Sequence, residues 1–253
     1  MNNQATIEKM MEMRLHGMMR AFRETFETGI KDNFNSDEII AHLVDAEWDE
    51  RYNKKLDNLL KKARFRYKAS CEQIDFKSSR KINKNNFLRF TTCDWVKKRE
   101  SILITGATGV GKSFVACALG HQACLSRYKV IYFNCMKLFS SLKYAKADGS
   151  YPKEISKIKK QDLIILDDFG LKKLDSDSRL ILLEILEDRH GEKSTIITSQ
   201  LPIKNWFEVI GDPTIADAIC DRLIHSSHKI DIKGESMRKV KEKNSGRNLP
   251  PKS

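Results

Sequence analysis

The chain has 253 residues, enough for one large domain or for a small domain followed by a medium one. Its 40% hydrophobic and 32% charged residues are typical of a globular protein; no run of about 18 apolar residues could span a bilayer, and residues 1–20 lack the pattern of a secretory signal, so we expect a cytoplasmic protein. The net charge of +12 favours polyanionic partners without choosing between DNA, RNA and an anionic membrane surface.

Residues 1–68 are expected to form an N-terminal helical domain. Between Ile7 and Phe26, apolar residues that include several methionines recur at steps of three and four, which predicts one helix. Ser36 is a suitable N-cap for a second helix, whose apolar stripe runs on to Ala63. The two helices are expected to pack as an antiparallel pair. A helical core explains the methionine-rich stripe, and a partner-binding surface is the alternative.

Residues 54–68 are strongly basic, with seven lysines and arginines against a single aspartate. Two explanations are open for this run: a solvated helix face and a surface that contacts phosphates. The candidates for DNA contact in it are Lys61, Lys62, Arg64 and Arg66. Residues 69–100 are expected to be a basic linker into the next domain, with a helix from about Phe87 to Lys98.

From residue 101 the pattern changes to short apolar runs that alternate with helical stretches. The runs are 101–105, 129–133, 162–166 and 194–198. Continuous apolar strands separated by helices predict a parallel sheet that is covered on both faces. We therefore expect an α/β domain over residues 101–240, followed by a disordered basic tail over residues 241–253.

The six cysteines are scattered, without a C-x-x-C pair or a nearby histidine at zinc-finger spacing. They are Cys71, Cys93, Cys117, Cys124, Cys135 and Cys220. We expect reduced, mostly buried thiols and no metal binding through cysteine.

The strongest functional signal lies between the first strand and the helix that follows it. Residues 106–113 match G-x-x-x-x-G-K-[ST] in full and have the flanking strand and helix that the motif requires. Glycines let the backbone N–H groups curl around phosphate oxygens, and the helix start adds its positive end. Lys112 is expected to neutralise the β- and γ-phosphates of ATP, and Ser113 to hold Mg²⁺. The residues expected to bind the nucleotide are Gly106, Ala107, Thr108, Gly109, Val110, Gly111, Lys112, Ser113 and Phe114.

Two carboxylates, Asp167 and Asp168, follow the apolar strand 162–166. In P-loop ATPases the first acid at such a strand end holds the Mg²⁺ shell, and its neighbour can polarise the attacking water as a general base. A solvated strand end would explain such a pair in isolation, but not after a complete phosphate loop. Ser199 and Gln200 end the strand 194–198, where a polar side chain could orient water toward the γ-phosphate. No N-K-x-D base-reading motif or arginine-rich lid is found in the sequence, which favours an ATPase over a GTPase or a small-molecule kinase.

The region from about residue 71 to residue 240 resembles the IstB family of insertion-sequence helper ATPases, relatives of the DnaC helicase loaders within the AAA+ class. The stretches that carry the resemblance are 104–113, 116–121, 163–170, 195–202, 210–213, 216–218, 221–223 and 234–238. The last four of these are specific in a way that the phosphate loop alone is not. The resemblance implies an AAA+ fold with a parallel sheet flanked by helices.

The resemblance also assigns roles to two arginines. Arg222 stands where the family places an arginine finger that reaches into a neighbouring subunit's site, and Arg238 stands at the second-sensor position near the γ-phosphate. A surface ion pair of Arg222 with Asp217 or Asp221 is the alternative. A finger implies a homo-oligomer. Asp168 stands where most AAA+ enzymes carry Glu, a substitution common in the resembled family, and slow turnover is expected from it.

The function that the resemblance implies is that of a transposition helper, which assembles on duplex DNA with ATP, presents that DNA to the transposase of the same element and is dismantled by hydrolysis. Lys172 and Lys173 are further candidates for DNA contact. A loader of the DnaC type, which delivers a replicative helicase, is one alternative, although residues 211–213 and 234–238 favour the helper. A DNA-binding assembly protein in which ATP is a switch and catalysis is incidental is the other.

Overall fold

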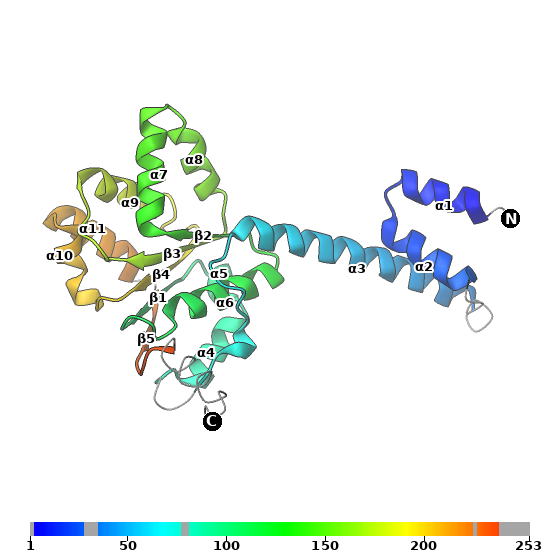
Figure 1. The fold of residues 1–253 in the computed structure, drawn as a ribbon, viewed down its shortest axis with the longest axis horizontal. Helices are drawn as coiled ribbons and strands as arrows, with labels where there is room; N and C mark the ends of the chain where they lie inside the picture. The colour runs from blue at the N-terminus through cyan, green and yellow to red at the C-terminus, as the bar shows by residue number, and fades with distance from the viewer. Residues whose placement is uncertain (1–2, 28–34, 77–80, 225–226, 238–253) are drawn as a thin grey trace, which may run out of the picture. The chain divides into compact units, whose positions relative to one another are not determined.

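The chain divides into two compact units, Met1–Asn58 and Leu59–Ser253. The computed structural model describes residues 3–27, 35–76, 81–224 and 227–237 (Figure 1). The division falls within a long helix, so the domain boundaries expected after residues 68 and 100 do not coincide with it. No helix among the described residues is long and apolar enough to cross a bilayer. The tail expected over residues 241–253 lies outside the described residues.

The first unit contains three helical segments among its described residues, where the sequence predicted two. They are α1 (Asn3–Glu12), α2 (His16–Glu27) and the part of α3 (Ser36–Ala63) that extends to Asn58. The prediction of one helix between Ile7 and Phe26 is wrong because α1 closes before Leu15, whose N–H bonds the carbonyl of Met10. Arg14 takes the left-handed conformation there, with φ of 58°. The continuous apolar stripe therefore conceals a turn.

Helix α2 packs against α3 at Gly17. A Cβ on Gly17 would lie 2.3 Å from the carbonyl oxygen of Ala46, so this approach requires a glycine. Beside it, the buried carboxylate of Glu47 accepts hydrogen bonds from the N–H groups of Gly17 (2.9 Å) and Met18 (3.2 Å). A carboxylate at a helix start also meets the positive end of the helix dipole. The unit is thus held by a polar anchor as well as by its apolar stripe.

The second unit is built on a five-stranded parallel sheet in the order β2-β3-β4-β1-β5 (Figure 1). Its strands are β1 (Ser101–Gly106), β2 (Val130–Asn134), β3 (Leu163–Phe169), β4 (Ser194–Ser199) and β5 (Ser227–Ile232). The four predicted strands are confirmed, and the α/β class with them. Strand β5 was not predicted, because its sequence alternates polar and apolar residues where the other strands are continuously apolar.

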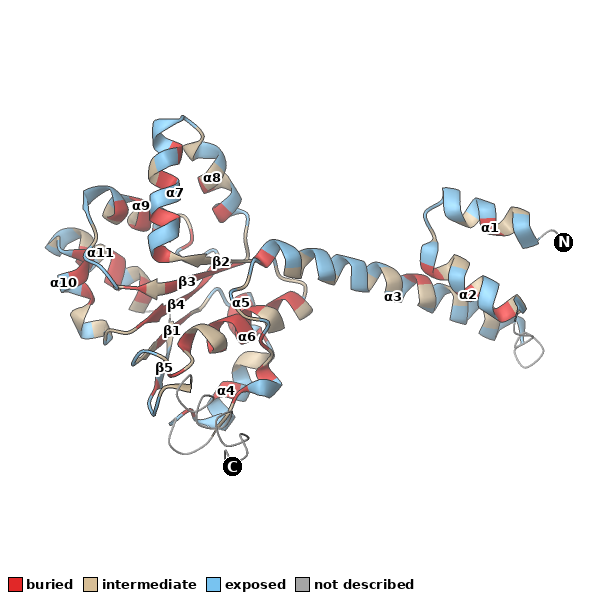
Figure 2. Ribbon diagram, in the orientation of Figure 1, coloured by how far each residue is buried: buried red, intermediate tan, exposed pale blue. Residues whose placement is uncertain are grey.

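Helices cover both faces of this sheet. The helical elements of this unit after α3 are η2 (Cys71–Gln73), α4 (Lys84–Thr91), α5 (Asp94–Lys97), α6 (Lys112–Leu125), α7 (Cys135–Ala147), α8 (Tyr151–Lys159), α9 (Ser176–Glu187), η4 (Ile203–Asn205), α10 (Trp206–Ile210) and α11 (Pro213–Ile224). Helix α6 packs on one face, where a Cβ on its Gly120 would meet Ile165 of β3. Helices α7, α9 and α11 pack on the other, around Leu103, Ile164 and Ile197. Figure 2 shows this buried layer along the strands.

The expected linker, residues 69–100, is largely folded where it is described. Ile74, Ile82, Phe87 and Trp95 are buried, and α4 packs against α6. The helix predicted from Phe87 to Lys98 is wrong in one respect: it breaks into α4 and α5 at Cys93, which has φ of 59°. The indole of Trp95 donates to the carbonyl of Phe90 across this break. The segment therefore belongs to the second unit as a packed part of it.

Candidate active site

The phosphate loop connects the end of β1 to the start of α6. Gly109 and Gly111 both have positive φ, 83° and 99°, so the loop curls in a way that side chains at these positions would strain. The loop is also tightly enclosed: a Cβ on Gly109 would lie 2.2 Å from the hydroxyl of Ser236, and the N–H of Met237 donates to the Gly109 carbonyl. The phosphate loop and residues 236–237, far apart in the chain, therefore shape one cradle at the positive end of α6.

Lys112 lies inside this cradle. Its side chain is almost fully buried, and its ammonium group donates to the carbonyl of Ala107 at 2.8 Å. Burial lowers the pKa of Lys112, and the negative charges of Asp168 and Asp167 oppose that shift. The group is held where incoming phosphate oxygens can replace the Ala107 carbonyl as its partner. This geometry and the oxygen donors nearby suit a Mg²⁺-bound nucleoside triphosphate.

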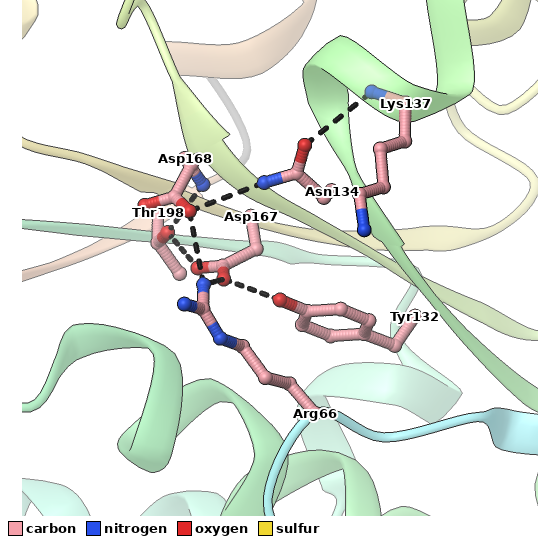
Figure 3. A network of polar contacts seen from close by, with 7 residues as sticks. All are labelled: Arg66, Tyr132, Asn134, Lys137, Asp167, Asp168 and Thr198. Atoms are coloured by element: carbon pink, nitrogen blue, oxygen red, sulfur yellow. Dashed lines mark hydrogen bonds and ion pairs between the residues drawn. The ribbon is translucent and has the colours of Figure 1, made fainter.

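The acidic pair lies at the end of β3, where the strand bulges. The register to β4 shifts between Leu166 and Phe169, and Asp168 takes φ of 61°. Thr198 of β4 stabilises the bulge: its hydroxyl accepts from the N–H of Asp168 at 3.1 Å and donates to the carboxylate of Asp167. The bulge therefore turns two successive carboxylates toward the same edge of the sheet, as Figure 3 shows.

Three further side chains hold these carboxylates (Figure 3). Tyr132 of β2 donates its hydroxyl to Asp167, which is fully buried. Asn134, at the end of β2, donates to Asp168 at 3.1 Å. Arg66 contacts both carboxylates from the segment after α3, at 3.4 Å to Asp167 and 3.1 Å to Asp168. Burial and the hydrogen bond to Asp167 raise the pKa of Tyr132, so its hydroxyl stays a donor at neutral pH.

The two residues at the end of β4 that were predicted to orient water have different surroundings. Ser199 is buried and donates its hydroxyl to the carbonyl of Phe169, so it is engaged in the fold. The amide oxygen of Gln200 accepts a hydrogen bond of 2.6 Å from Thr108 in the phosphate loop. Of the two, Gln200 is the one that reaches the nucleotide cradle. A water-orienting role for either stays a prediction.

Arg222 lies at the opposite, amino-terminal edge of the sheet. It is near the end of α11 and lines a small depression with Ser101 and Thr195. Ser101 is the first residue of β1, and Thr195 is the second residue of β4. Its guanidinium pairs with Glu187 at 2.8 Å, and the alternative pair with Asp217 or Asp221 stays a prediction. The finger role stays a prediction, and Arg238, the predicted second sensor, lies outside the described residues.

Five of the six candidates for DNA contact line two depressions, and Asp168 lines both of them. Lys62, Arg64 and Arg66 line a groove beside β2, and Lys61 is exposed on α3 close to them. The other two, Lys172 and Lys173, line a smaller depression after β3. Arg66 is a special case, because it is bound to the acidic pair.

Several residues of the site were not among the predicted ones. Asn134 had a visible signal, since it is a polar residue that directly follows an apolar run, as Asp167 does. Thr198 directly precedes the predicted Ser199. The contact of Arg66 with residues about a hundred positions away had no signal in the pattern of the chain.

Comparison with known proteins agrees with this geometry. The model of the IstB-like ATP binding protein family matches residues 8–245. An insertion sequence ATP-binding protein of Sinorhizobium fredii (strain NBRC 101917 / NGR234) is 42% identical over 240 residues, which cover 95% of this chain and 98% of that protein. An insertion sequence IS21 ATP-binding protein of Pseudomonas aeruginosa is 30% identical over 86% of this chain and 82% of its own length.

Two solved structures share the fold. AMPPCP-bound DnaA from Aquifex aeolicus aligns with a TM-score of 0.59 and 19% identity, over 75% of this chain and 58% of that one. The DnaC helicase loader aligns with a TM-score of 0.53 and 19% identity, over 72% of this chain and 99% of that one. The predicted AAA+ P-loop fold and the predicted family resemblance are both confirmed. The chain belongs to the family of IstB-like ATP-binding proteins.

Proposed function

We propose that this protein is the ATP-hydrolysing helper of an insertion-sequence transposition system. With ATP it assembles on duplex target DNA as a homo-oligomer and recruits or stimulates the transposase of the same element, and hydrolysis drives disassembly. The observation that carries the catalytic part is the meeting of Lys112, Asp167 and Asp168 at one edge of the sheet. The 42% identity to an insertion sequence ATP-binding protein favours the helper over a helicase loader, whose likeness is one of fold.

In this proposal the chain's own groups divide the work of hydrolysis. The N–H groups of the phosphate loop and Lys112 bind and neutralise the triphosphate. Ser113 and Asp167 would hold Mg²⁺, which supplies charge neutralisation at the β- and γ-phosphates. Asp168 accepts the proton of the attacking water, and Gln200 lies close enough to the loop to orient that water.

Arg222 is proposed to complete the site of a neighbouring subunit. In its own chain it lies at the far end of strands such as β1, whose six residues span about 20 Å. Such a separation prevents contact with the phosphate loop of the same chain, so a role at a γ-phosphate requires a second copy. The charge of Arg222 would then stabilise the transferred phosphoryl group.

The proposal is tested by measuring ATP turnover and sedimentation with and without duplex DNA, for the unaltered chain and for Lys112→Ala. We expect a large assembly and stimulated turnover only when ATP and duplex DNA are both present, and neither with Lys112→Ala. A chain that stays monomeric, or that hydrolyses ATP equally well without DNA, would contradict the helper function.

A second arm separates hydrolysis from a switch. Asp168→Asn removes the proton acceptor but keeps the side-chain size and the possibility of the bond to Asn134. We expect it to assemble on DNA with ATP and then to remain assembled. If it supports repeated rounds of transposition as the unaltered chain does, ATP is a switch and catalysis is incidental.

A further inference from the structure

A groove of about 1120 Å³ runs beside β2, the strand at one edge of the sheet. Ile131 and Phe133 of β2 contribute to its lining. Further lining comes from residues 59–66, from the rest of β2 with Lys129, from α7, from α8 with the residues that follow it, and from Asp168 of β3. The groove is larger than most sites for small ligands, which rarely exceed roughly 1,000 Å³.

Positive charge dominates this groove. Its basic residues are Lys62, Arg64, Arg66, Lys129, Lys137, Lys157 and Lys160, and its acidic residues are Glu154 and Asp168. Among the described residues Lys62, Arg64 and Lys137 make no ion pair, whereas Lys157 pairs with Glu154. Exposed cations that converge without neutralising partners attract a polyanion, and a row of them fits the repeating charge of a phosphate backbone.

The backbone of one groove lysine is linked to the acidic pair through Asn134, the N-cap of α7. The backbone N–H of Lys137 donates to the side chain of Asn134, whose amide group in turn donates to Asp168 (Figure 3). The groove and the acidic pair are therefore parts of one continuous network.

Arg66 links the groove to the acidic pair by direct ion pairs. It lines the groove, its side chain is 40% exposed, and its guanidinium bonds both carboxylates. While it does so, it fills oxygen positions that a metal-bound water and the attacking water need. Charge-assisted bonds of this kind are exchangeable, because a phosphate can replace a carboxylate as the partner of an arginine.

We propose that the groove beside β2 binds the phosphate backbone of DNA, and that Arg66 links its occupation to the acidic pair. This inference rests on the proposed function and adds the place of DNA contact and a means of stimulation. A phosphate in the groove draws the guanidinium of Arg66 away from Asp167 and Asp168. Without DNA, Arg66 restrains hydrolysis; with DNA, both carboxylates are released for it.

The first test is DNA binding by the full chain with a non-hydrolysable ATP analogue. The groove variant is Lys62→Gln/Arg64→Gln/Lys137→Gln, and its charge-matched control outside the groove is Lys98→Gln/Lys204→Gln/Lys229→Gln. We expect the groove variant to lose at least about tenfold in affinity and two to three units of the salt slope, and the control to lose less than about threefold. Equal losses in both variants, or none in the groove variant, would overturn the inference.

The same titration is run with duplex and with single-stranded DNA, and we expect the duplex to bind more tightly; a preference for single strands would contradict the proposed assembly on duplex DNA. If the unaltered chain binds neither, the proposed function itself fails. If it binds DNA and the groove variant binds it equally well, only the present inference fails.

The second test measures turnover of Arg66→Gln with and without DNA, and its affinity for the nucleotide analogue as a check on folding. We expect DNA-free turnover to rise several-fold, the stimulation by DNA to shrink, and nucleotide affinity to be retained. Arg66→Lys keeps a charge but not the two-pronged geometry, so its DNA-free turnover should lie between those of the unaltered chain and of Arg66→Gln. A DNA-free rate that is unchanged or lower in Arg66→Gln would overturn the link.

Discussion

Arginines lie at both the amino-terminal and the carboxyl-terminal edge of the parallel sheet, that is, at the two ends of its strands. They are bound there by different kinds of partner. At the amino-terminal edge, Arg189 is 2% exposed and donates to backbone carbonyls, among them Ser194 at 2.6 Å and Gln161 at 3.0 Å. Burial lowers its pKa to about 10, against the opposing charge of Asp162. At the carboxyl-terminal edge, Arg66 is partly exposed and bonds two carboxylates.

The two arginines differ in whether their partners can be exchanged. Backbone carbonyl groups are fixed parts of the fold, so Arg189 is a permanent link between α8, the segment that follows it and β4. Carboxylates at a strand end can exchange one cation for another, so the partners of Arg66 are open to competition. Arg222 is intermediate between the two, since it lies at the amino-terminal edge, as Arg189 does, but pairs with an exposed carboxylate, that of Glu187.

The largest effect expected from this contrast is on Arg222. We predict that Arg222→Ala lowers turnover roughly 10³-fold with little change in nucleotide affinity or stability, because its exposed pair with Glu187 contributes little. Turnover and analogue binding are measured in the same assembly on DNA. Mixing Arg222→Ala with Asp168→Asn subunits, which are expected to assemble, should restore part of the activity, since one pairing of subunits then has a complete site. No recovery on mixing would contradict action between subunits.

Arg189 should show the opposite behaviour. Arg189→Met leaves buried carbonyls of Gln161 and Ser194 without their donor, and we predict a loss of about 3 kcal/mol of stability. That corresponds to a decrease in Tm of roughly 6–12 °C for a unit of this size. Thermal unfolding measures it, and turnover per folded molecule at low temperature should be nearly unchanged. A normal Tm would show that the carbonyls find other partners.

Two threonines on β4 sharpen the comparison, because they lie on one strand at its two ends. Thr198→Val removes the hydroxyl that holds Asp167 and the N–H of Asp168, and we predict a fall in turnover of about tenfold or more. Thr195→Val removes a hydroxyl that accepts only from Arg189 among the described side chains, and turnover should stay within about twofold. Equal effects on turnover would mean that Thr198 acts on the fold rather than on the carboxylates.

The four strands that the sequence predicted correctly are local features, each contained in a few consecutive residues. The phosphate loop and the acidic pair, which follow β1 and end β3, are equally local patterns, and their roles stay predictions. The misses involve residues whose conformation goes against their type, such as Arg14 and Cys93 with positive φ, or a strand with polar alternation. The surroundings of the acidic pair were missed for another reason: Arg66 and Tyr132 meet Asp167 only through the tertiary fold.

A change at Tyr132 gives the smallest predicted effect. It tests how firmly the Asp167 carboxylate is held at the carboxyl-terminal edge of the sheet. Tyr132→Phe leaves Asp167 with Thr198 and Arg66, so the carboxylate stays bound but can turn. One neutral hydrogen bond is worth about 1 kcal/mol, so we predict that the Mg²⁺ concentration for half-maximal turnover rises roughly two- to fivefold. Tyr151→Phe is the control, because its hydroxyl bonds the exposed Glu184 away from the site.

The result also bears on Arg66. If Tyr132→Phe alters the Mg²⁺ dependence only when DNA is absent, then Arg66 and the metal compete for the same oxygen of Asp167, the one that Tyr132 also contacts. If the shift is the same with and without DNA, Tyr132 positions Asp167 independently of the guanidinium. An unchanged Mg²⁺ dependence in both conditions would show that the two remaining partners fix Asp167 on their own, and that the carboxyl-terminal edge is as rigid as the amino-terminal one.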